Sequence, residues 1–223
     1  MPFDSYRNRV LKNSNVRGQL TAQSSDFINQ TFEHHPSFQV VKIEGVETGV
    51  RIIVDREYSV MNEFNIMKMQ LRPQTSVNRG DIIEITNPQG VIEKWIVIFF
   101  QNKGLYPDAH IRFCNNVLTF ANDNVHPIVI DNKLQRYQEI EERSYINLPD
   151  DALSVAMPCN ADTLGIRQKD KFVINNKTWE AQVIDDVTNV YNGKGIVQMI
   201  IRRKADEPDE GAVAYVPGGG QRW

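Results

Sequence analysis

Two charged runs are the residues of this chain that come closest to catalytic or binding chemistry. Asp185-Asp186 is a pair of carboxylates, the residue type that general acid–base catalysis uses. The pair follows a predicted strand and precedes a hairpin loop over residues 192–195, so turn formation is the simpler explanation. Arg202-Arg203-Lys204 is a basic cluster that could contact phosphate, but acidic residues follow it at once and favour a neutralised surface. Neither run predicts an active site.

The histidines and cysteines do not form a metal-binding pattern. His34 and His35 are adjacent, so a helix would point their rings in different directions. Cys114 and Cys159 are far apart and no C-x-x-C pair is present, which argues against a zinc site. The sequence also contains no Gly-x-Ser-x-Gly run, no His-Glu-x-x-His run and no Gly-rich phosphate loop. We therefore predict no catalytic residues, no metal and no cofactor.

The first 38 residues are polar and predict short helices. Ser24 or Ser25 is the predicted N-cap of the main helix. Phe27, Ile28 and Phe32 are predicted to form its apolar face. Pro36 ends this helix, and residues 5–11 predict an earlier helical turn. Helices with so little apolar surface are not stable alone. We expect this arm to dock on the rest of the chain or on a neighbouring subunit.

From residue 39 onward, alternating apolar residues and frequent turn signals predict short β-strands. Such a pattern is typical of small barrels and sandwiches. Residues 133–143 could form either a helix or a strand. The other predicted strands cover residues 40–43, 50–54, 66–71, 81–85, 94–100, 109–114, 116–120, 127–130, 153–157, 171–174, 178–184 and 195–202.

Two β segments echo each other. Each has a proline, a turn ending in Asp, a short strand, a strand opened by Trp, a loop with Tyr and an apolar returning strand. The corresponding residues are Pro73, Asp81, Trp95, Tyr106 and Ile111 in the first segment and Pro158, Asp170, Trp179, Tyr191 and Ile196 in the second. We expect each Asp to close a turn and each Trp to cover one end of a core. The alternative is a single larger antiparallel sheet whose hairpins agree by coincidence.

The predicted fold is therefore mainly β, with two small antiparallel β-barrel or sandwich modules in tandem, preceded by short N-terminal helices. The predicted boundaries are a helical arm over residues 1–38, a first β-module over 39–125, a second β-module over 126–203 and a flexible C-terminal tail over 204–223.

Composition excludes several classes of protein. The 223 residues carry 25 Lys+Arg and 28 Asp+Glu, a net charge of -3 that argues against a basic nucleic-acid clamp and a polybasic membrane binder. Two cysteines are too few for a disulfide scaffold. The longest apolar run, residues 95–100, is too short to span a bilayer, and the first residues lack the apolar core of a secretion signal. We expect a soluble protein of cytoplasmic type.

Folded modules without a reactive constellation indicate an assembly protein. The arm, the tail and the charged blocks are segments that need a partner. In ring-shaped assemblies one surface packs on a different surface of the next copy, and such contacts close into a ring when the rotation allows it.

Short motifs along the chain resemble neck-region proteins of tailed bacteriophages of Gram-positive hosts. The motifs are Ser5-Tyr6-Arg7-Asn8-Arg9-Val10, Phe27 with Thr31-Phe32, Pro36-Ser37 with Val40, Gly80-Asp81, Lys94-Trp95-Ile96-Val97, Cys114-Asn115-Asn116-Val117-Leu118-Thr119-Phe120, Asp162-Thr163, Asp170-Lys171-Phe172 and Gly195-Ile196. The resemblance extends to about Arg203, and Phe120 stands where that family leads us to expect Trp. The tail after Lys204 has no counterpart.

The resemblance implies a head-closure or head–tail connector component of the virion. Such a protein would be a β-barrel made in the host cytoplasm and built into the neck as a hexameric or dodecameric ring of identical copies. Its protein partners would be the portal or adaptor and the tail proteins. Packaged DNA would pass through the lumen without sequence readout. No membrane would be a partner. A mildly acidic wall would let DNA slide. Candidate lumen or subunit contacts are Asp185, Asp186, Tyr191, Lys194, Arg202 and Arg203.

Two alternatives stay open. The protein could belong to the tail instead, as an adaptor or baseplate component. It could also be a nucleic-acid-binding β-barrel, which would need exposed aromatic residues interleaved with Lys and Arg. Trp95 and Trp179 lie within apolar strands and are interpreted as core residues, which disfavours this second alternative.

Overall fold

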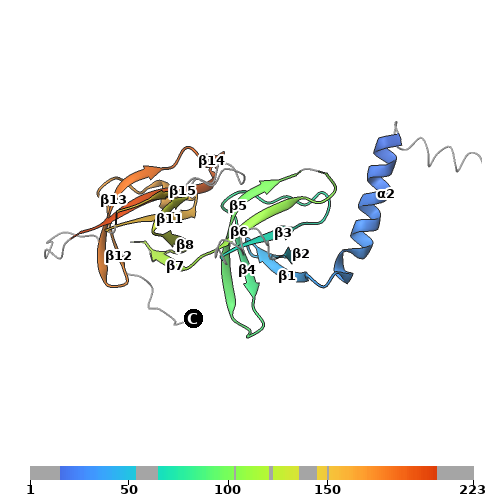
Figure 1. Ribbon diagram of the computed structural model, residues 1–223, viewed down its shortest axis with the longest axis horizontal. Coiled ribbons are helices and arrows are strands. Elements are labelled where there is room, and N and C mark those ends of the chain that lie inside the picture. Colours follow the sequence, from blue (N-terminus) through green and yellow to red (C-terminus); the bar gives the residue numbers. More distant parts are fainter. Residues whose placement is uncertain are drawn as a thin grey trace, which may run out of the picture.

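The chain folds as a helical arm and two β-modules that lie one after the other (Figure 1). The computed structural model describes residues 16–53, 65–102, 104–120, 123–135, 145–149 and 151–204. A mainly β architecture with two barrel-like sheets in tandem behind an N-terminal helix confirms the predicted fold class. The predicted turn over residues 5–11 and the predicted tail from residue 205 lie outside the described residues.

In the described part of the chain, no helix has both the length and the apolar character needed to cross a membrane.

The arm is one helix, α2 (Val16–Thr31), followed by the 3-10 turn η1 (Phe32–His34). Ser24 and Ser25 lie inside this helix, so the prediction that one of them caps it is wrong. Ile28 and Phe32, one turn apart, are buried, whereas Phe27 is 66% exposed. The predicted common face of all three is therefore wrong, because consecutive helical residues point about 100° apart.

Two arginines of the first module fasten the end of the arm. The Arg51 guanidinium lies 4.4 Å from the centre of the Phe32 ring and donates to the Phe32 and Thr31 carbonyl oxygens, at 3.1 Å each. Arg72 pairs with Glu33 at 2.5 Å. The two Arg51 bonds satisfy carbonyl groups that the end of a helix leaves without partners.

The first module is a closed antiparallel barrel in the order β1-β2-β3-β6-β5-β4. Its strands are β1 (Phe38–Ile43), β2 (Val46–Ile53), β3 (Ile66–Gln70), β4 (Ile82–Thr86), β5 (Ile92–Gln101) and β6 (Asp108–Phe113). Pairing of Lys42 with Glu84 and of Ile43 with Ile83 joins β1 to β4 and closes the barrel. Its interior is filled by alternating apolar side chains such as Met69, Ile83 and Trp95.

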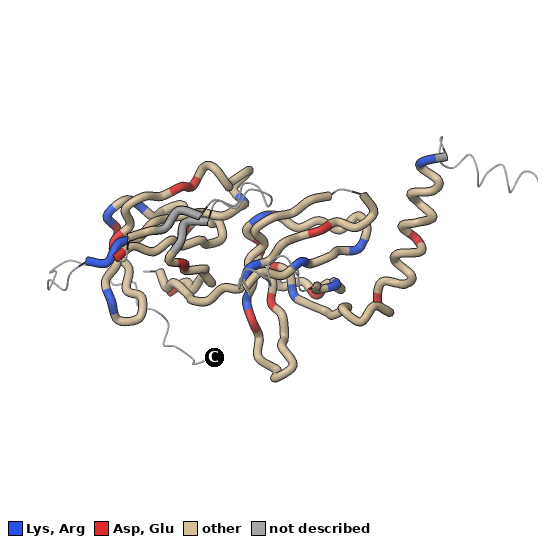
Figure 2. The backbone as a smooth tube through the Cα atoms, in the orientation of Figure 1, with Lys and Arg blue, Asp and Glu red and all other residues tan. Residues whose placement is uncertain are grey.

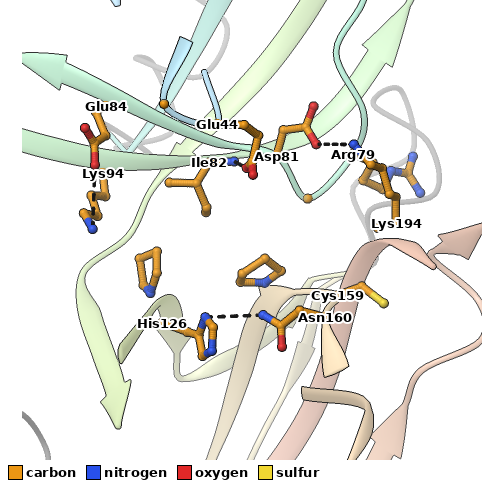
Figure 3. A pocket seen from close by; sticks show the side chains of 15 residues that line it. Glu44, Arg79, Asp81, Ile82, Glu84, Lys94, His126, Cys159, Asn160 and Lys194 are labelled. Atoms are coloured by element: carbon orange, nitrogen blue, oxygen red, sulfur yellow. Dashed lines mark hydrogen bonds and ion pairs between the residues drawn. The ribbon is translucent and has the colours of Figure 1, made fainter. Parts of the chain in front are cut away.

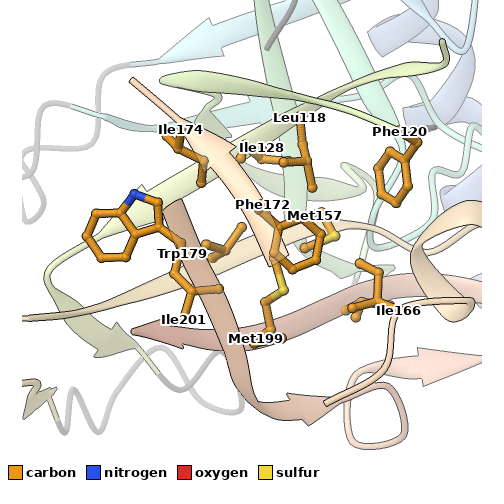
Figure 4. Close-up of a cluster of buried hydrophobic side chains, with 13 residues drawn as sticks. Leu118, Phe120, Ile128, Met157, Ile166, Phe172, Ile174, Trp179, Met199 and Ile201 are labelled. Carbon is orange, nitrogen blue, oxygen red and sulfur yellow. The ribbon is translucent and has the colours of Figure 1, made fainter. Parts of the chain in front are cut away.

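The second module is a sheet in the order β7-β8-β11-β15-β13-β12, with β14 paired to β15. Its elements are β7 (Asn116–Thr119), β8 (Val125–Asp131), β11 (Ala152–Pro158), the short helix α4 (Ala161–Leu164), β12 (Lys171–Ile174), β13 (Lys177–Asp185), β14 (Val190–Tyr191) and β15 (Lys194–Arg203). A small hairpin of β9 (Lys133–Gln135) and β10 (Tyr145–Asn147) lies between β8 and β11, so the described start of the ambiguous stretch 133–143 is strand. Side chains from the main strands meet in one core, including Leu118, Phe172 and Met199 (Figure 4).

The boundary between the modules needs a correction. The predicted boundary puts residues 116–125 in the first module, but β7 pairs with β8 along its whole length and joins the second sheet. Strand pairing is a long-range choice that an alternating pattern does not encode. The second module therefore begins at about Asn116.

The two modules repeat one plan, as the echo predicts. Strands β7, β8, β11, β12, β13 and β15 occupy the places of β1, β2, β3, β4, β5 and β6 in the sheet order. Asp81 accepts a hydrogen bond from the Asn78 N–H at 2.7 Å, and Asp170 accepts one from the Arg167 N–H at 2.8 Å. Both copies also carry a β-bulge just after the second residue beyond Trp, in β5 and in β13. The repeat is thus structural, and the single-sheet alternative is wrong.

Candidate functional site

The junction between the two modules is the most elaborate polar and apolar arrangement in the described structure. The outer face of the barrel presents Ile66, Ile96 and Ile98 to the second sheet, which contributes Val129, Ala156 and Ile196. All six are buried. Strand β5 is apolar on both faces. Trp95 and Val97 pack inside the barrel. Ile96 and Ile98 pack in the junction.

Two glycines bring the backbones of the modules into direct contact. Gly80 has φ +90°, and a Cβ at this position would lie 1.9 Å from the Gly195 carbonyl oxygen. Gly195 has φ +141°, and a Cβ there would lie 2.0 Å from the Asn189 carbonyl oxygen. The Gly195 carbonyl is itself held by the Cys159 N–H at 2.8 Å. Only glycine fits either position, for reasons of both conformation and space.

Polar contacts surround the glycines. The Arg79 guanidinium donates to the Asn189 side-chain oxygen at 2.5 Å, and partial burial lowers the pKa of Arg79. Lys194 lies 3.7 Å from Asp81. On the other side of the junction, Arg112 of β6 pairs with Asp131 of β8. These contacts join each module to the other at both margins of the apolar patch.

The linker between the modules is also tied down. The Asn115 side chain donates to the Ile130 carbonyl and accepts from the Ile130 N–H, each at 2.8 Å. The Cys114 N–H donates to the Lys94 carbonyl at 2.9 Å. With the linker, the apolar patch and the polar margins all fixed, the two modules form one stiff unit.

A cleft of about 390 Å³ opens beside this junction (Figure 3). The barrel side carries Glu44, Asp81, Glu84 and Lys94, and the opposite side carries His126, Cys159, Asn160 and Lys194. Glu44 accepts the Ile82 N–H at 2.7 Å, and Lys94 lies 3.8 Å from Glu84. Lys94 is thus paired with Glu84, while Glu44 is held by a backbone N–H group.

His126 and Cys159 are the cleft residues closest to nucleophilic chemistry. His126 contacts Asp162 through Nε2 at 2.8 Å and Asn160 through Nδ1 at 3.3 Å, so both ring nitrogens are occupied. Burial, and then the charge of Asp186, raise the pKa of the Cys159 thiol, the opposite of what activates a cysteine. Asn160 also caps α4 in a capping box with Thr163. This arrangement orders the α4 turn.

No group of three or more His, Cys, Asp or Glu side chains gathers where it could hold a metal ion, within the residues that the structure describes. Both cysteines are free and half-buried.

The structure separates the six predicted contact residues into three places. Tyr191 and Lys194 form the hairpin at the junction, where Tyr191 is 80% exposed on the rim of a second hollow of about 320 Å³. Arg202 and Arg203 lie at the other end of β15, about 30 Å away at roughly 3.3 Å per residue. The six therefore do not form one site, and their role as lumen or subunit contacts stays a prediction.

Asp185 ends β13 and organises the following turn, as its sequence context predicts. Its carboxylate accepts the N–H groups of Val187 at 3.2 Å and Thr188 at 2.8 Å. Burial alone raises the pKa of Asp185, but the hydrogen bonds from Thr188 and Val187 outweigh it and leave the pKa below its ordinary value. Asp186 is exposed in the same turn.

Sequence reasoning missed the contact of Arg79 and Gly80 with Asn189 and Gly195. Gly80-Asp81 and Gly195-Ile196 carried part of the resemblance to neck-region proteins, and the structure gives the physical reason for glycine at both places. The available signal was the glycine itself, because a turn at these positions does not by itself require glycine.

Comparison with known proteins agrees with the position of the second module. Residues 111–202 match the YomX C-terminal domain family, a domain of phage-type Bacillus proteins. The matched segment begins within β6 and ends one residue before the end of β15, and thus contains nearly the whole second sheet. The match suggests a phage-related protein. No curated protein and no solved structure matches the chain.

Proposed function

We propose that this chain is a non-enzymatic structural protein of a phage particle, which forms a ring in the neck and connects the portal and head to the tail around the DNA channel. The observation that carries the proposal is the arm. Among the described residues, the two-module body contacts α2 at its last turn, and the helix runs away from the barrel from there (Figure 1).

Two large apolar side chains of α2 are left exposed. Leu20 and Phe27 are 58% and 66% exposed, and their spacing of two helical turns places them on one face. A 16-residue helix of this composition, which includes Gly18, is marginal on its own in water. We assign the next copy of the chain as the partner, because head-to-tail packing of one surface on a different surface closes into a ring. The match to a phage-type domain supports a particle in which such rings are built.

The packing between the two modules also fits a structural component that carries mechanical force. Apolar packing, the close contact of two glycines and an ion pair join the two modules. A displacement of one module by a neighbouring protein would therefore move the other module with it. In the cleft Lys94 pairs with Glu84 and Lys194 with Asp81, and His126 contacts Asp162, which suits a structural role.

The experiment is the oligomeric state of the full chain, measured by native mass spectrometry over a range of concentrations. We expect a closed ring for the wild type and smaller species for Leu20→Gln/Phe27→Gln. Val40→Thr/Val46→Thr is the matched control, since these side chains are equally exposed on the barrel, and it should leave the ring intact. A chain that stays monomeric at high concentration, with and without portal and tail proteins, refutes the ring.

Position in the particle separates the neck from the tail. Labelled antibody against this chain should bind at the head–tail joint in electron micrographs of intact particles. Labelling at the distal end of the tail would instead support the adaptor or baseplate alternative.

A further inference from the structure

The second module carries an uneven distribution of charge. Segments 167–180 and 202–204 hold seven cationic side chains, against the carboxylates Asp170 and Glu180. The seven are Arg167, Lys169, Lys171, Lys177, Arg202, Arg203 and Lys204. Figure 2 shows the corresponding blue segments gathered at the end of the second module that is remote from the barrel. We call these seven residues the basic end.

Strand register brings the basic end together from two parts of the chain. Lys171 pairs with Glu180 across β12 and β13, and Glu180 pairs with Arg202 across β13 and β15. The Lys204 N–H donates to the Thr178 carbonyl at 3.1 Å, and the Lys169 N–H to the Ala181 carbonyl at 2.8 Å. The whole group therefore spans about four strand residues, or roughly 13 Å.

The basic side chains lie outside a packed core. Phe172, Trp179 and Ile201 point into the core of the module, and Lys171 and Arg202, which alternate with Phe172 and Ile201, lie on the outer face. Lys177 and Arg203 share the side of Trp179 and are exposed at the end of their strands. Asp151 pairs with Arg202 at 2.5 Å, where both side chains are well exposed. The described part of this end therefore carries seven cations against the three carboxylates Asp151, Asp170 and Glu180, an excess of positive charge.

Lys171 and Lys204 are close enough to influence each other. Partial burial, and then the neighbouring Lys204 ammonium, lower the pKa of Lys171, while Glu180 opposes the shift. Two ammonium groups held side by side repel, and an anion placed between them relieves this repulsion.

We propose that the basic end binds nucleic acid through its backbone phosphates, without reading the bases. Phosphate is the anion that suits a spread of Lys and Arg on an open sheet face, because each cation can meet a separate phosphate along the strand. The described basic end contains no exposed aromatic side chain for stacking on bases, which is why the binding should be insensitive to sequence. This proposal needs no ring and can fail while the proposed function stands.

The barrel supplies a matched control surface. Lys42, Glu84 and Lys94 form a row across β1, β4 and β5 with the same order of charges as Lys171, Glu180 and Arg202. This row lacks the further cations that surround the basic end. Removing Lys42 and Lys94 changes the net charge of the protein as much as removing Lys171 and Lys204 does.

The test is fluorescence anisotropy of a labelled DNA duplex of random sequence with the full chain over a series of salt concentrations. We expect Lys171→Gln/Lys204→Gln to reduce the slope of log Kd against log salt by about 2, which amounts to about a tenfold smaller change in affinity between 50 and 200 mM salt. Lys42→Gln/Lys94→Gln should bind as the wild type does. Lys171→Arg/Lys204→Arg keeps the charge and should also bind, which separates charge from any effect on folding.

Three results would overturn the proposal. The first is that the wild type does not bind the duplex at 50 mM salt. The second is that the two Gln double variants lose affinity equally. The third is that the Arg double variant loses as much affinity as the Gln double variant at the basic end. Binding of polyglutamate but not of DNA by the wild type would also count against the proposal, because the surface would then favour a carboxylate-rich protein partner.

Discussion

Gly80→Ala should loosen the junction between the modules far more than an alanine at another glycine of the same conformation. Gly80 and Gly90 have φ values of +90° and +80°, so alanine at either position costs about 1–2 kcal/mol in backbone conformation. Nothing lies within 4 Å of a Cβ at Gly90, whereas one at Gly80 would overlap the Gly195 carbonyl oxygen at 1.9 Å. That oxygen is fixed by the Cys159 N–H, so the modules must shift apart.

The extra overlap has a magnitude that can be measured. Forcing one carbon into a packed interface costs about 1–3 kcal/mol, so the free energy of unfolding of Gly80→Ala should fall below that of Gly90→Ala by this amount. For a slope of about 2 kcal/mol per molar urea, the midpoint would move by roughly 0.5–1.5 M. Urea unfolding followed by circular dichroism compares the wild type with both variants.

The shape of the curve carries a second result. An opened junction uncouples the modules, so Gly80→Ala should unfold in two steps where Gly90→Ala unfolds as the wild type does. If the two variants share one midpoint and one curve shape, the backbone contact of Gly80 with Gly195 does not hold the modules together, and the reasoning on the stiff unit fails.

Three further predictions concern single side chains. Asp131→Asn leaves Arg112, which is only 8% exposed, without its carboxylate, and should lower the free energy of unfolding by roughly 2 kcal/mol or more in urea. The lowered pKa of Asp185 means that its contribution to stability is complete above its unfolded pKa and is lost as the pH falls through its folded pKa; Asp185→Asn should therefore flatten the acid limb of stability against pH, and an unchanged limb contradicts this. Burial raises the pKa of Cys114 to about 12, so iodoacetamide followed by mass spectrometry should modify Cys159 before Cys114 in the folded protein, with both modified after unfolding.

The repeated plan of the two modules could be predicted because its signals are local. Asp81 and Asp170 close turns onto residues three positions earlier, and such turns depend on a few neighbouring residues. The alternation around Trp95 and Trp179 likewise reflects the two-residue period of a strand with one face in a core. The echo in sequence therefore became a repeat in structure.

The helical arm was predicted only in part. Phe32 and the proline after it marked the end of the helix, but its start at Val16 and the exposure of Phe27 depend on which face meets the barrel. A sequence with few apolar residues does not specify that face, because the contact is made by Arg51 of β2 and by Arg72, which follows β3, both far from the helix in the chain.

What the sequence by itself determined is most of the strands, the two related modules and the balance of charge. What only the tertiary structure decided is which segments meet: β7 with β8, Gly80 with Gly195, and Lys171 with Lys204. The net charge of -3 concealed a basic end because it sums over the chain, whereas strand register collects cations from two distant segments on one surface. Contacts of this kind join residues far apart in the chain, and their partners are selected by packing rather than by any local pattern.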